Sequence, residues 1–240
     1  MGRAKRRKGA APVGAMDTND DDGTIEELDG PFDIEDFDDP SAAEHARLDL
    51  GSVLIPIPQT GQVQVELTEA GVPNAVWVVT PNGRFTIAAY AAPKSAGLWR
   101  EVAGELGESL RKDGAQVSIT DGPWGREVHG AGAGAVRFIG VDGYRWMIRC
   151  VANGALESME ALAAEAREAL ADTVVRRGDN PLPVRTPLPV VLPEPMAEQL
   201  REAAAARAAE APQQQPPTES VARRSVDGSA MQQLRTITGG

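Results

Sequence analysis

The chain has 240 residues, a formal net charge of −11 and a single cysteine, Cys150. One cysteine excludes an intrachain disulfide and fits a reducing compartment, so we expect a cytoplasmic protein. No run of the sequence approaches the roughly 18 consecutive apolar residues of a membrane span, and the basic start is followed by Gly, Ala and acids rather than an apolar stretch. We therefore expect neither a signal peptide nor a membrane helix.

The negative charge is concentrated near the N-terminus. Residues 1–8 carry five basic side chains, residues 9–46 carry 13 acids and no Lys or Arg, and residues 47–192 carry 14 basic and 16 acidic groups. Because like charges repel and few apolar groups offset the entropy of ordering, we expect residues 1–46 to be a disordered tail, basic and then acidic. The alternative is an acidic-hydrophobic interaction motif, because apolar side chains punctuate the acids: Ile25, Leu28, Phe32, Ile34 and Phe37.

The first part of the predicted domain is rich in strand signals. Strands are expected over residues 52–57, 62–68, 75–80 and 84–91. Asn82-Gly83 is a strong hairpin signal, because both residue types tolerate positive φ. A two-residue turn there would pair Val79 with Thr86 and leave apolar side chains on both faces of the hairpin. We therefore expect this hairpin to be covered on both sides and central in its sheet.

Two amphipathic helices interrupt the strands. The first is predicted to be capped by Ser95 and to end at Gly114, with apolar positions at helical spacing: Leu98, Val102, Leu106 and Leu110. Further strands are expected over residues 116–120, 125–129, 135–140 and 144–152. The second helix is marked by Leu156, Met159, Leu162, Ala166 and Leu170. The predicted fold class is α+β, with a mainly antiparallel sheet and two amphipathic helices.

The domain is expected to cover residues 47–192 and to end in a Pro-rich strap. Prolines beyond Arg177 favour an extended path that lies along the domain, although presentation to a partner is the alternative. The strap would bury Leu182, Val184, Leu188, Val190, Val191 and Leu192. Residues 193–240 read as an Ala/Gln/Pro-rich tail, mostly disordered, with a marginal helix over residues 194–210.

Groups for catalysis or metal binding are scarce. The two histidines, His45 and His129, are far apart in the sequence and lie beside no nucleophile pattern, and Cys150 lies in an apolar strand. We therefore nominate no catalytic residue, no metal site and no cofactor, and expect a non-enzymatic protein. Glycines at 130, 132 and 134 resemble a phosphate-binding loop, but a strand rather than a helix follows them, so a hairpin connection is the simpler interpretation.

Three arginines could form a binding face near Asp142-Gly143. A two-residue turn there would mix Arg137 with the apolar Trp146 and Ile148, so we expect a three-residue loop over residues 141–143 with Gly143 left-handed. That register gathers Arg137, Arg145 and Arg149 on one face, which would suit a phosphate, a carboxylate or an acidic peptide. The alternative is that these arginines pair with helix acids such as Glu101, Glu105, Glu165 or Glu168.

A second candidate recognition element is the segment Asp121-Gly-Pro-Trp124-Gly-Arg126. A Trp on a Gly-flanked turn can be an exposed platform, with Arg126 beside it. The alternative is that Trp124 folds back as a lid on the core. The candidate ligand-binding set is thus Trp124, Arg126, Arg137, Arg145 and Arg149.

Three segments resemble an uncharacterised actinobacterial family, domain of unknown function 3710. They are Gly122-Pro-Trp-Gly-Arg-Glu127, Asp142-Gly-Tyr-Arg-Trp146 with Arg149, and Val174-Val-Arg-Arg-Gly178 followed by Pro181-Leu-Pro. The resemblance covers about residues 45–193 and implies no activity, cofactor or catalytic residue. The use of 20 Arg to four Lys also suits a high-GC actinobacterium. The order of strands, helix, strands and helix is similar to the Mog1/PsbP-like α+β fold.

The leading functional hypothesis is a cytoplasmic protein-interaction or regulatory module with an unknown protein partner. The alternative is a small-anion or nucleotide-binding domain that uses the arginine face. Nucleic-acid binding through the basic N-terminus ranks third, because five positive charges lie beside 13 acids within the same chain.

Overall fold

The computed structural model describes residues 30–68 and 71–210 of the chain. It divides into two compact units at Glu194. The described part of the second unit is a helix, α4 (Glu194–Glu210), as the Ala-rich sequence predicts. Everything else described below belongs to the first unit.

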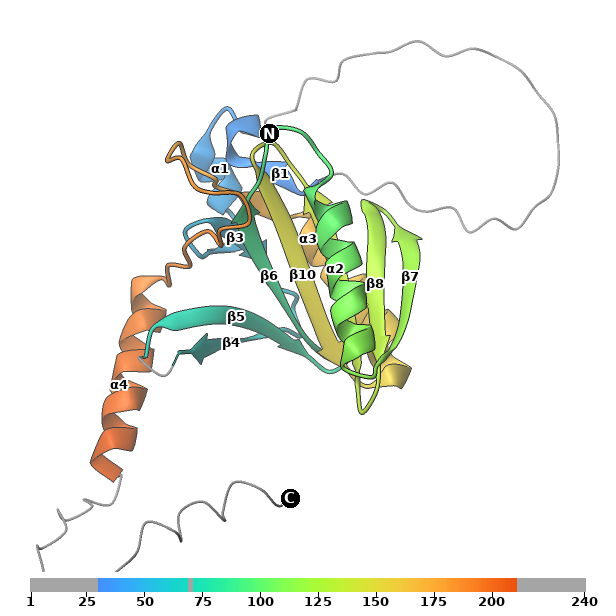
Figure 1. The fold of residues 1–240 in the computed structure, drawn as a ribbon. Helices are drawn as coiled ribbons and strands as arrows, with labels where there is room; N and C mark the ends of the chain where they lie inside the picture. The colour runs from blue at the N-terminus through green and yellow to red at the C-terminus, as the bar shows by residue number, and fades with distance from the viewer. Residues whose placement is uncertain (1–29, 69–70, 211–240) are drawn as a thin grey trace, which may run out of the picture. The chain divides into compact units, whose positions relative to one another are not determined.

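A seven-stranded antiparallel sheet dominates the first unit (Figure 1). In spatial order its strands are β4 (Gln62–Leu67), β5 (Pro73–Thr80), β6 (Gly83–Ala91), β10 (Trp146–Gly154), β9 (Ala135–Asp142), β8 (Gly125–Ala131) and β7 (Gln116–Gly122). Every neighbouring pair in it is antiparallel. The predicted α+β class with a mainly antiparallel sheet is confirmed.

Two helices cover opposite faces of this sheet. Helix α2 (Leu98–Lys112) packs over β7, β8 and β9, whereas α3 (Met159–Ala171), which follows the short η2 (Leu156–Ser158), packs on β10, β6 and β9. Two consecutive residues of β10 show the two faces: Met147 belongs to the buried cluster that contains Trp99 of α2, and Ile148 belongs to the cluster that contains Leu162 of α3. Figure 1 shows α2 in front of the sheet and α3 behind it. Both predicted helices are confirmed, in the predicted order between strands.

A small four-stranded sheet carries the N-terminal segment. Its order is β1 (Phe32–Asp33), β11 (Val174–Val175), β3 (Val53–Pro56) and β2 (Arg47–Asp49), and β1 runs parallel to β11. Between β1 and β2 lie η1 (Ile34–Asp36) and α1 (Pro40–Glu44).

The expectation that the domain begins at residue 47 is wrong for residues 30–46. Phe32, Ile34 and Phe37 pack against a buried cluster of Ala43, Leu54 and Val174. These three side chains thus have an intramolecular role. Their partial burial offsets the entropy cost of ordering this acidic segment. The preceding part of the predicted tail, residues 1–29, lies outside the described residues.

The Pro-rich strap is intramolecular, as predicted. The backbone N–H of Leu188 donates to the carbonyl of Ala89 at 2.9 Å, and the N–H of Val191 donates to the carbonyl of Leu50 at 2.9 Å. Leu188 is buried in the core, and Val190 and Leu192 pack against it. Three further apolar side chains that were expected to be buried are exposed: Leu182, Val184 and Val191.

The β5–β6 hairpin differs from its prediction by two residues. Thr80 pairs with Gly83 and Trp77 with Thr86, so Pro81 and Asn82 form the two-residue turn. A shift of two preserves which side chains share a face, because strand side chains alternate with a period of two. The predicted apolar face is therefore buried, but the other face is only half-buried, with Arg84 stacked 4.4 Å from the Trp77 ring.

The packing of Trp99 on Gly140 fixes how closely α2 approaches β9. A Cβ at residue 140 would overlap the Trp99 indole, whereas a Cβ at Gly104, on the same helix, would meet no atom within 4 Å. We expect Gly140→Ala to lower the free energy of unfolding by about 1–3 kcal/mol through overpacking. Gly104→Ala should raise it by about 0.5–1 kcal/mol, because Ala favours the helical conformation. Urea denaturation measures both, and equal effects of the two variants would contradict this packing.

Candidate functional site

The β9–β10 hairpin has a register that separates the predicted arginines. Asp142 pairs with Met147 and Gly140 with Arg149, and residues 143–145 connect the two strands. The predicted three-residue loop at 141–143 is wrong, and so is the face that it would build. Arg137 pairs with Ala152 and shares the α3 side of the sheet with Ile139, whereas Arg149 lies on the α2 side.

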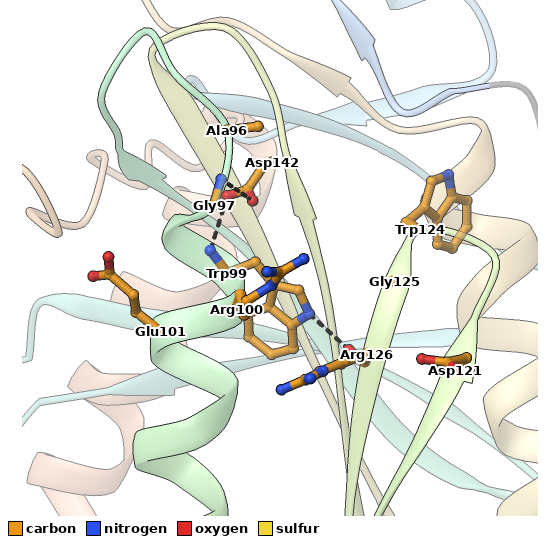
Figure 2. A pocket seen from close by; sticks show the side chains of 10 residues that line it. All are labelled: Ala96, Gly97, Trp99, Arg100, Glu101, Asp121, Trp124, Gly125, Arg126 and Asp142. Carbon is orange, nitrogen blue, oxygen red and sulfur yellow. Dashed lines mark hydrogen bonds between the residues drawn. The ribbon is translucent and has the colours of Figure 1, made fainter.

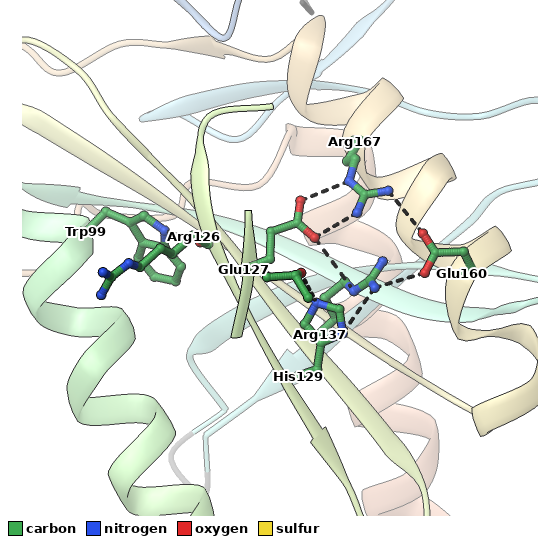
Figure 3. Close-up of polar contacts among 8 residues, drawn as sticks. Trp99, Arg126, Glu127, His129, Arg137, Glu160 and Arg167 are labelled. Atoms are coloured by element: carbon green, nitrogen blue, oxygen red, sulfur yellow. Dashed lines mark hydrogen bonds and ion pairs between the residues drawn. The ribbon is translucent and has the colours of Figure 1, made fainter. Parts of the chain in front are cut away.

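Arg137 is tolerated on the apolar face because an acidic partner is buried with it (Figure 3). Arg137 is 5% exposed and Glu127 of β8 only 1% exposed. The Arg137 Nε lies 3.7 Å from the Glu127 carboxylate, and its Nη2 lies 2.9 Å from Glu160. Arg167 of α3 donates to both Glu127 oxygens, at 2.9 and 2.8 Å. The alternative prediction, pairing with acids of the helices, thus holds for Arg137, although with Glu160 rather than with the four acids named.

Histidine 129 completes this cluster. The Arg137 Nη2 donates to the His129 Nδ1 at 3.1 Å, and because arginine can only donate, Nδ1 is unprotonated there. The other ring nitrogen, Nε2, lies 2.9 Å from the Thr120 hydroxyl. Burial and the charge of Arg137 together lower the pKa of His129 below its ordinary value of 6.5. The pKa of Glu160 is lowered mainly by its hydrogen bond from Arg137. This cluster links α3 to β8 and β9, although the buried Nε and Nη1 of Arg137 have no hydrogen-bond partner within the described residues.

The other two predicted arginines lie apart from Arg137. Arg145 is in the hairpin connection with a φ of 65°, the left-handed conformation that the sequence analysis assigned to Gly143. Its guanidinium donates to the carbonyl of Asp179 at 3.4 Å. Arg149 stacks 4.9 Å from the Tyr90 ring centroid. The structure therefore does not bring Arg137, Arg145 and Arg149 together on one face.

A cavity lies elsewhere, between the N-terminus of α2 and the tip of the β7–β8 hairpin (Figure 2). It has a volume of about 730 Å³. We call it the α2–hairpin cavity. Two predicted site residues, Trp124 and Arg126, line it together with Ala96, Gly97, Trp99, Arg100, Glu101, Asp121, Gly125 and Asp142.

Two arginines without an acidic partner line this cavity. Among the residues that the structure describes, Arg100 and Arg126 have no acidic partner. Glu101 is 3.3 Å from Arg185, and the Asp142 carboxylate accepts two backbone N–H groups, so both of these acids are occupied. Asp121 is the lining acid that has no such partner. The cavity therefore offers two free guanidiniums against one free carboxylate.

Asp142 caps α2 from a distant strand. Its carboxylate accepts the N–H of Gly97 at 2.8 Å and the N–H of Trp99 at 2.9 Å. The prediction that Ser95 caps this helix is wrong, because the helix begins at Leu98 with Gly97 as its N-cap and no local side chain bonds the cap. The predicted C-terminal end is confirmed, with Gly114 at a φ of +82°. Asp142 thus places a negative charge at the helix N-terminus and occupies two of its N–H groups.

Trp124 has features of both predicted alternatives. It lines the cavity, yet it also packs against the main core as a half-buried side chain. Its indole N–H donates to the carbonyl of Gly30 at 2.6 Å. The tip of the hairpin is therefore tied to the point where the described N-terminal segment begins.

Arg100, Asp121 and Asp142 are the site residues that sequence reasoning missed. Arg100 lies on the polar face of a predicted helix and Asp121 in a predicted turn, so each looks like an ordinary surface charge. No local pattern shows that the start of α2 faces the β7–β8 tip. Only the pairing of β8 with β9 brings them together.

The single cysteine and the glycine-rich connection do not form a reactive or phosphate-binding site within the described residues. The Cys150 thiol is fully buried, and burial raises its pKa. The glycines at 132 and 134 connect β8 to β9 as a tight hairpin, with the N–H of Gly132 donating to the carbonyl of Gly134 at 2.8 Å. Within residues 30–68 and 71–210, no group of three His, Cys, Asp or Glu side chains is arranged to hold a metal ion.

The sequence matches one protein family over residues 30–199, described as "Protein of unknown function (DUF3710)". The chain belongs to this family. The match begins at Gly30, where the described structure begins, and so includes the segment that the sequence analysis placed outside the domain. The description assigns the family no activity. No curated protein matches the chain.

Two solved structures share a weak similarity of fold with this protein. One is cyanobacterial PsbP (CyanoP) from Synechocystis sp. PCC 6803, with a TM-score of 0.33, 9% identity, and coverage of 54% of this chain and 93% of that one. The other is LpqN of Mycobacterium tuberculosis, involved in cell envelope biogenesis, with a TM-score of 0.30, 15% identity, and coverage of 61% and 99%. Among the described helices, none has the length and apolar character needed to cross a membrane.

The Asp142 cap gives a stability prediction for this DUF3710 domain. We expect Asp142→Ala to lower the free energy of unfolding by about 1–2 kcal/mol, because two N–H groups of the α2 terminus lose their acceptor. Asp121→Ala is the matched control, since it removes an exposed carboxylate from the same cavity and should change stability by less than about 0.5 kcal/mol. Urea denaturation compares the two, and an equal loss in both variants would contradict the capping role.

The lowered pKa of His129 predicts a pH dependence. A histidine held neutral in the folded state contributes stability above its unfolded pKa of about 6.5 that is lost as the pH falls towards the folded value. We therefore expect the free energy of unfolding to decrease between about pH 7.5 and about pH 5. The decrease should be smaller in His129→Gln and unchanged in His45→Gln, an exposed control. A similar pH slope in both variants would exclude His129 as the source.

Proposed function

We propose that this domain is a non-enzymatic interaction module that binds an acidic protein segment in the α2–hairpin cavity. The observation that supports this is the pair of guanidiniums, Arg100 and Arg126, which line an open cavity without an acidic partner among the described residues. Planar guanidiniums bind carboxylates through two parallel hydrogen bonds, so two of them from different elements suit two carboxylates of one segment. The Trp124 ring, which lines the same cavity, offers an apolar surface for this segment.

The geometry favours carboxylates over a nucleotide or free phosphate. A phosphate site at a helix terminus uses backbone N–H groups, and here Asp142 already accepts the N–H groups of Gly97 and Trp99. The unpaired Asp121 would also repel a multiply charged phosphate. A peptide with spaced carboxylates meets the two arginines while keeping its distance from Asp121.

The size and lining of the cavity are those of a binding site for a peptide segment rather than of an enzyme active site. Its volume of about 730 Å³ is within the range of ligand sites, roughly 300–1,000 Å³, and its lining comes from both a helix and a hairpin. No pair of a nucleophile and a base lies among its lining residues. We accordingly place the protein among binding modules.

The setting of this module is proposed on sequence grounds. A single cysteine supports the cytoplasm, and the excess of Arg over Lys, 20 to four, supports an actinobacterial source. Small-anion binding is the second candidate function, and Arg149 is the arginine that favours it. Nucleic-acid binding through residues 3–8 stays a prediction, because these residues lie outside the described structure.

The proposal is tested by titrating the full chain with a fluorescein-labelled, aspartate-rich peptide and following fluorescence anisotropy. We expect binding that weakens with added salt and that falls about tenfold or more in the double variant Arg100→Gln/Arg126→Gln, because each lost guanidinium removes a charge-assisted hydrogen bond. Arg111→Gln is the matched control, since this exposed arginine lies on α2 but outside the cavity.

Two outcomes would overturn the proposed function. One is the absence of peptide binding by the unaltered chain at low salt. The other is an equal loss in Arg111→Gln and in the cavity variant, which would show a general effect of net charge rather than a site.

A further inference from the structure

A second, smaller cavity lies on the α2 side of the sheet, between the C-terminal half of α2, the strap and strands β6 and β10. Its volume is about 310 Å³. It shares no lining residue with the α2–hairpin cavity. Three of its lining residues are apolar, namely Val102 and Leu106 of α2 and Met147 of β10. We call it the Arg149 groove, after the arginine that it contains.

Arg149 enters this groove without an acidic partner. Its guanidinium stacks 4.9 Å from the Tyr90 ring, and its Nη2 donates to the Tyr90 hydroxyl. Its Nε is buried with no hydrogen-bond partner. No carboxylate of the described residues lies within ion-pair distance of Arg149. A half-buried cation held mainly by a ring and one hydroxyl is under-compensated, because its loss of hydration is not balanced by a counter-charge.

The acid of the groove is committed to another arginine. The Glu105 carboxylate accepts a hydrogen bond from each terminal nitrogen of Arg185, both at 2.9 Å. Arg185 belongs to the strap, so this pair also holds the strap against α2 at one rim of the groove. Glu105 is therefore not free to neutralise Arg149, and the groove keeps one uncommitted positive charge beside an apolar wall.

We propose that the Arg149 groove binds a small monocarboxylate with an apolar body. The carboxylate takes the place of the missing counter-charge at Arg149, and the Tyr90 hydroxyl keeps the guanidinium oriented towards it. The apolar body lies over Val102, Leu106 and Met147, where its burial contributes roughly 25 cal/mol per Å². The volume, near the lower limit of roughly 300 Å³ for ligand sites, suits a short acyl or aryl acid.

Other ligand classes fit this groove less well. A phosphate carries up to two negative charges and needs several donors, whereas one uncommitted arginine lies opposite the acidic Glu105 at the rim. A neutral apolar molecule would leave the Arg149 charge uncompensated, and an amine would be repelled by it. The combination of one cation with an apolar wall thus selects a single carboxylate.

The experiment uses sodium hexanoate as the probe and the full ¹⁵N,¹³C-labelled chain, observed by NMR. We expect saturable shifts of the methyl groups of Val102, Leu106 and Met147. Pentan-1-ol and pentylamine have the same pentyl chain as hexanoate without the carboxylate, as does hexan-1-ol with one further CH2, so all three should bind at least about tenfold more weakly. Equal binding of hexanol, or shifts confined to other residues, would overturn the proposal.

A matched pair of variants tests the role of Arg149. Arg149→Gln should weaken hexanoate binding by about tenfold to a hundredfold, since a hydrogen bond to a charged group is lost. Arg84→Gln is the control, because Arg84 also stacks on an aromatic ring of this sheet, Trp77, but lies outside the groove. The affinity of this variant for hexanoate should be unchanged. Unchanged affinity in Arg149→Gln would overturn the proposal.

If Arg149→Gln does not fold, which loss of dispersion in its NMR spectrum would show, the variants Tyr90→Phe and Leu106→Ala are tested instead. Tyr90→Phe removes the hydroxyl that orients Arg149 and should weaken hexanoate binding, whereas hexanol binding should stay the same. Leu106→Ala should weaken both. Equal affinity of unaltered and Tyr90→Phe protein for hexanoate would contradict the proposal. The aspartate-rich peptide addresses a different cavity, so either proposal fails or holds without the other.

Discussion

The buried carboxylate of Glu127 is the constraint on which the rest of this domain depends. It is 1% exposed and receives Arg167 from α3 through two hydrogen bonds, with Arg137 of β9 3.7 Å away. Desolvating such a charge costs several kcal/mol unless cations are buried with it, so β8, β9 and α3 must assemble together. This requirement explains why β9 turns Arg137 towards the core rather than towards solvent. It also selects the register of the β9–β10 hairpin, because the register decides which side chains of β9 face α3, and Arg137 must be among them.

The position of α2 follows from the same register. With β9 placed in this way, Gly140 faces α2 and admits the Trp99 indole, whose N–H donates to the carbonyl of Arg126 at 2.7 Å. Asp142, two residues further along β9, reaches the N-terminus of the helix and caps it. The helix is thus attached to β8 and β9 and leaves the β6 and β10 half of that sheet face less covered. Both cavities lie along the borders of α2: one at its N-terminus, the other beside β10.

Segments from both ends of the chain complete the domain. The N-terminal segment is held by two indoles, since Trp124 donates to the carbonyl of Gly30 and Trp146 donates to the Asp33 carboxylate at 2.7 Å. The strap bonds to the edge of β6 through Ala89 and to residue 50 in front of β3. These contacts join distant parts of the sequence, and they make the folded unit longer at its N-terminus than its composition indicated. The acids of residues 30–46 did not prevent folding because Phe32, Ile34 and Phe37 found a buried surface.

The sequence by itself determined the faces of the elements. Apolar spacing predicted both helices, and the period of two predicted the buried face of β5 and β6 even though their turn lies elsewhere. The apolar content of the strap also predicted its intramolecular course. These features are local: each depends on side chains a few residues apart, which share a face through backbone geometry alone.

Tertiary structure decided the β9–β10 register, the cap of α2 and the grouping of the arginines. Trp124 and Arg126 meet in a cavity, but Arg137, Arg145 and Arg149 separate, because a charge on an apolar face is acceptable only when a partner from another element is buried with it. Glu127 is such a partner, the exposed Glu160 adds a second ion pair, and nothing near Arg137 in the sequence indicates either of them. Asp142 likewise replaces Ser95 as the cap because strand pairing brings it to the helix end. Electrostatic partnership across distant segments is a property of the assembled fold, which local sequence patterns do not contain.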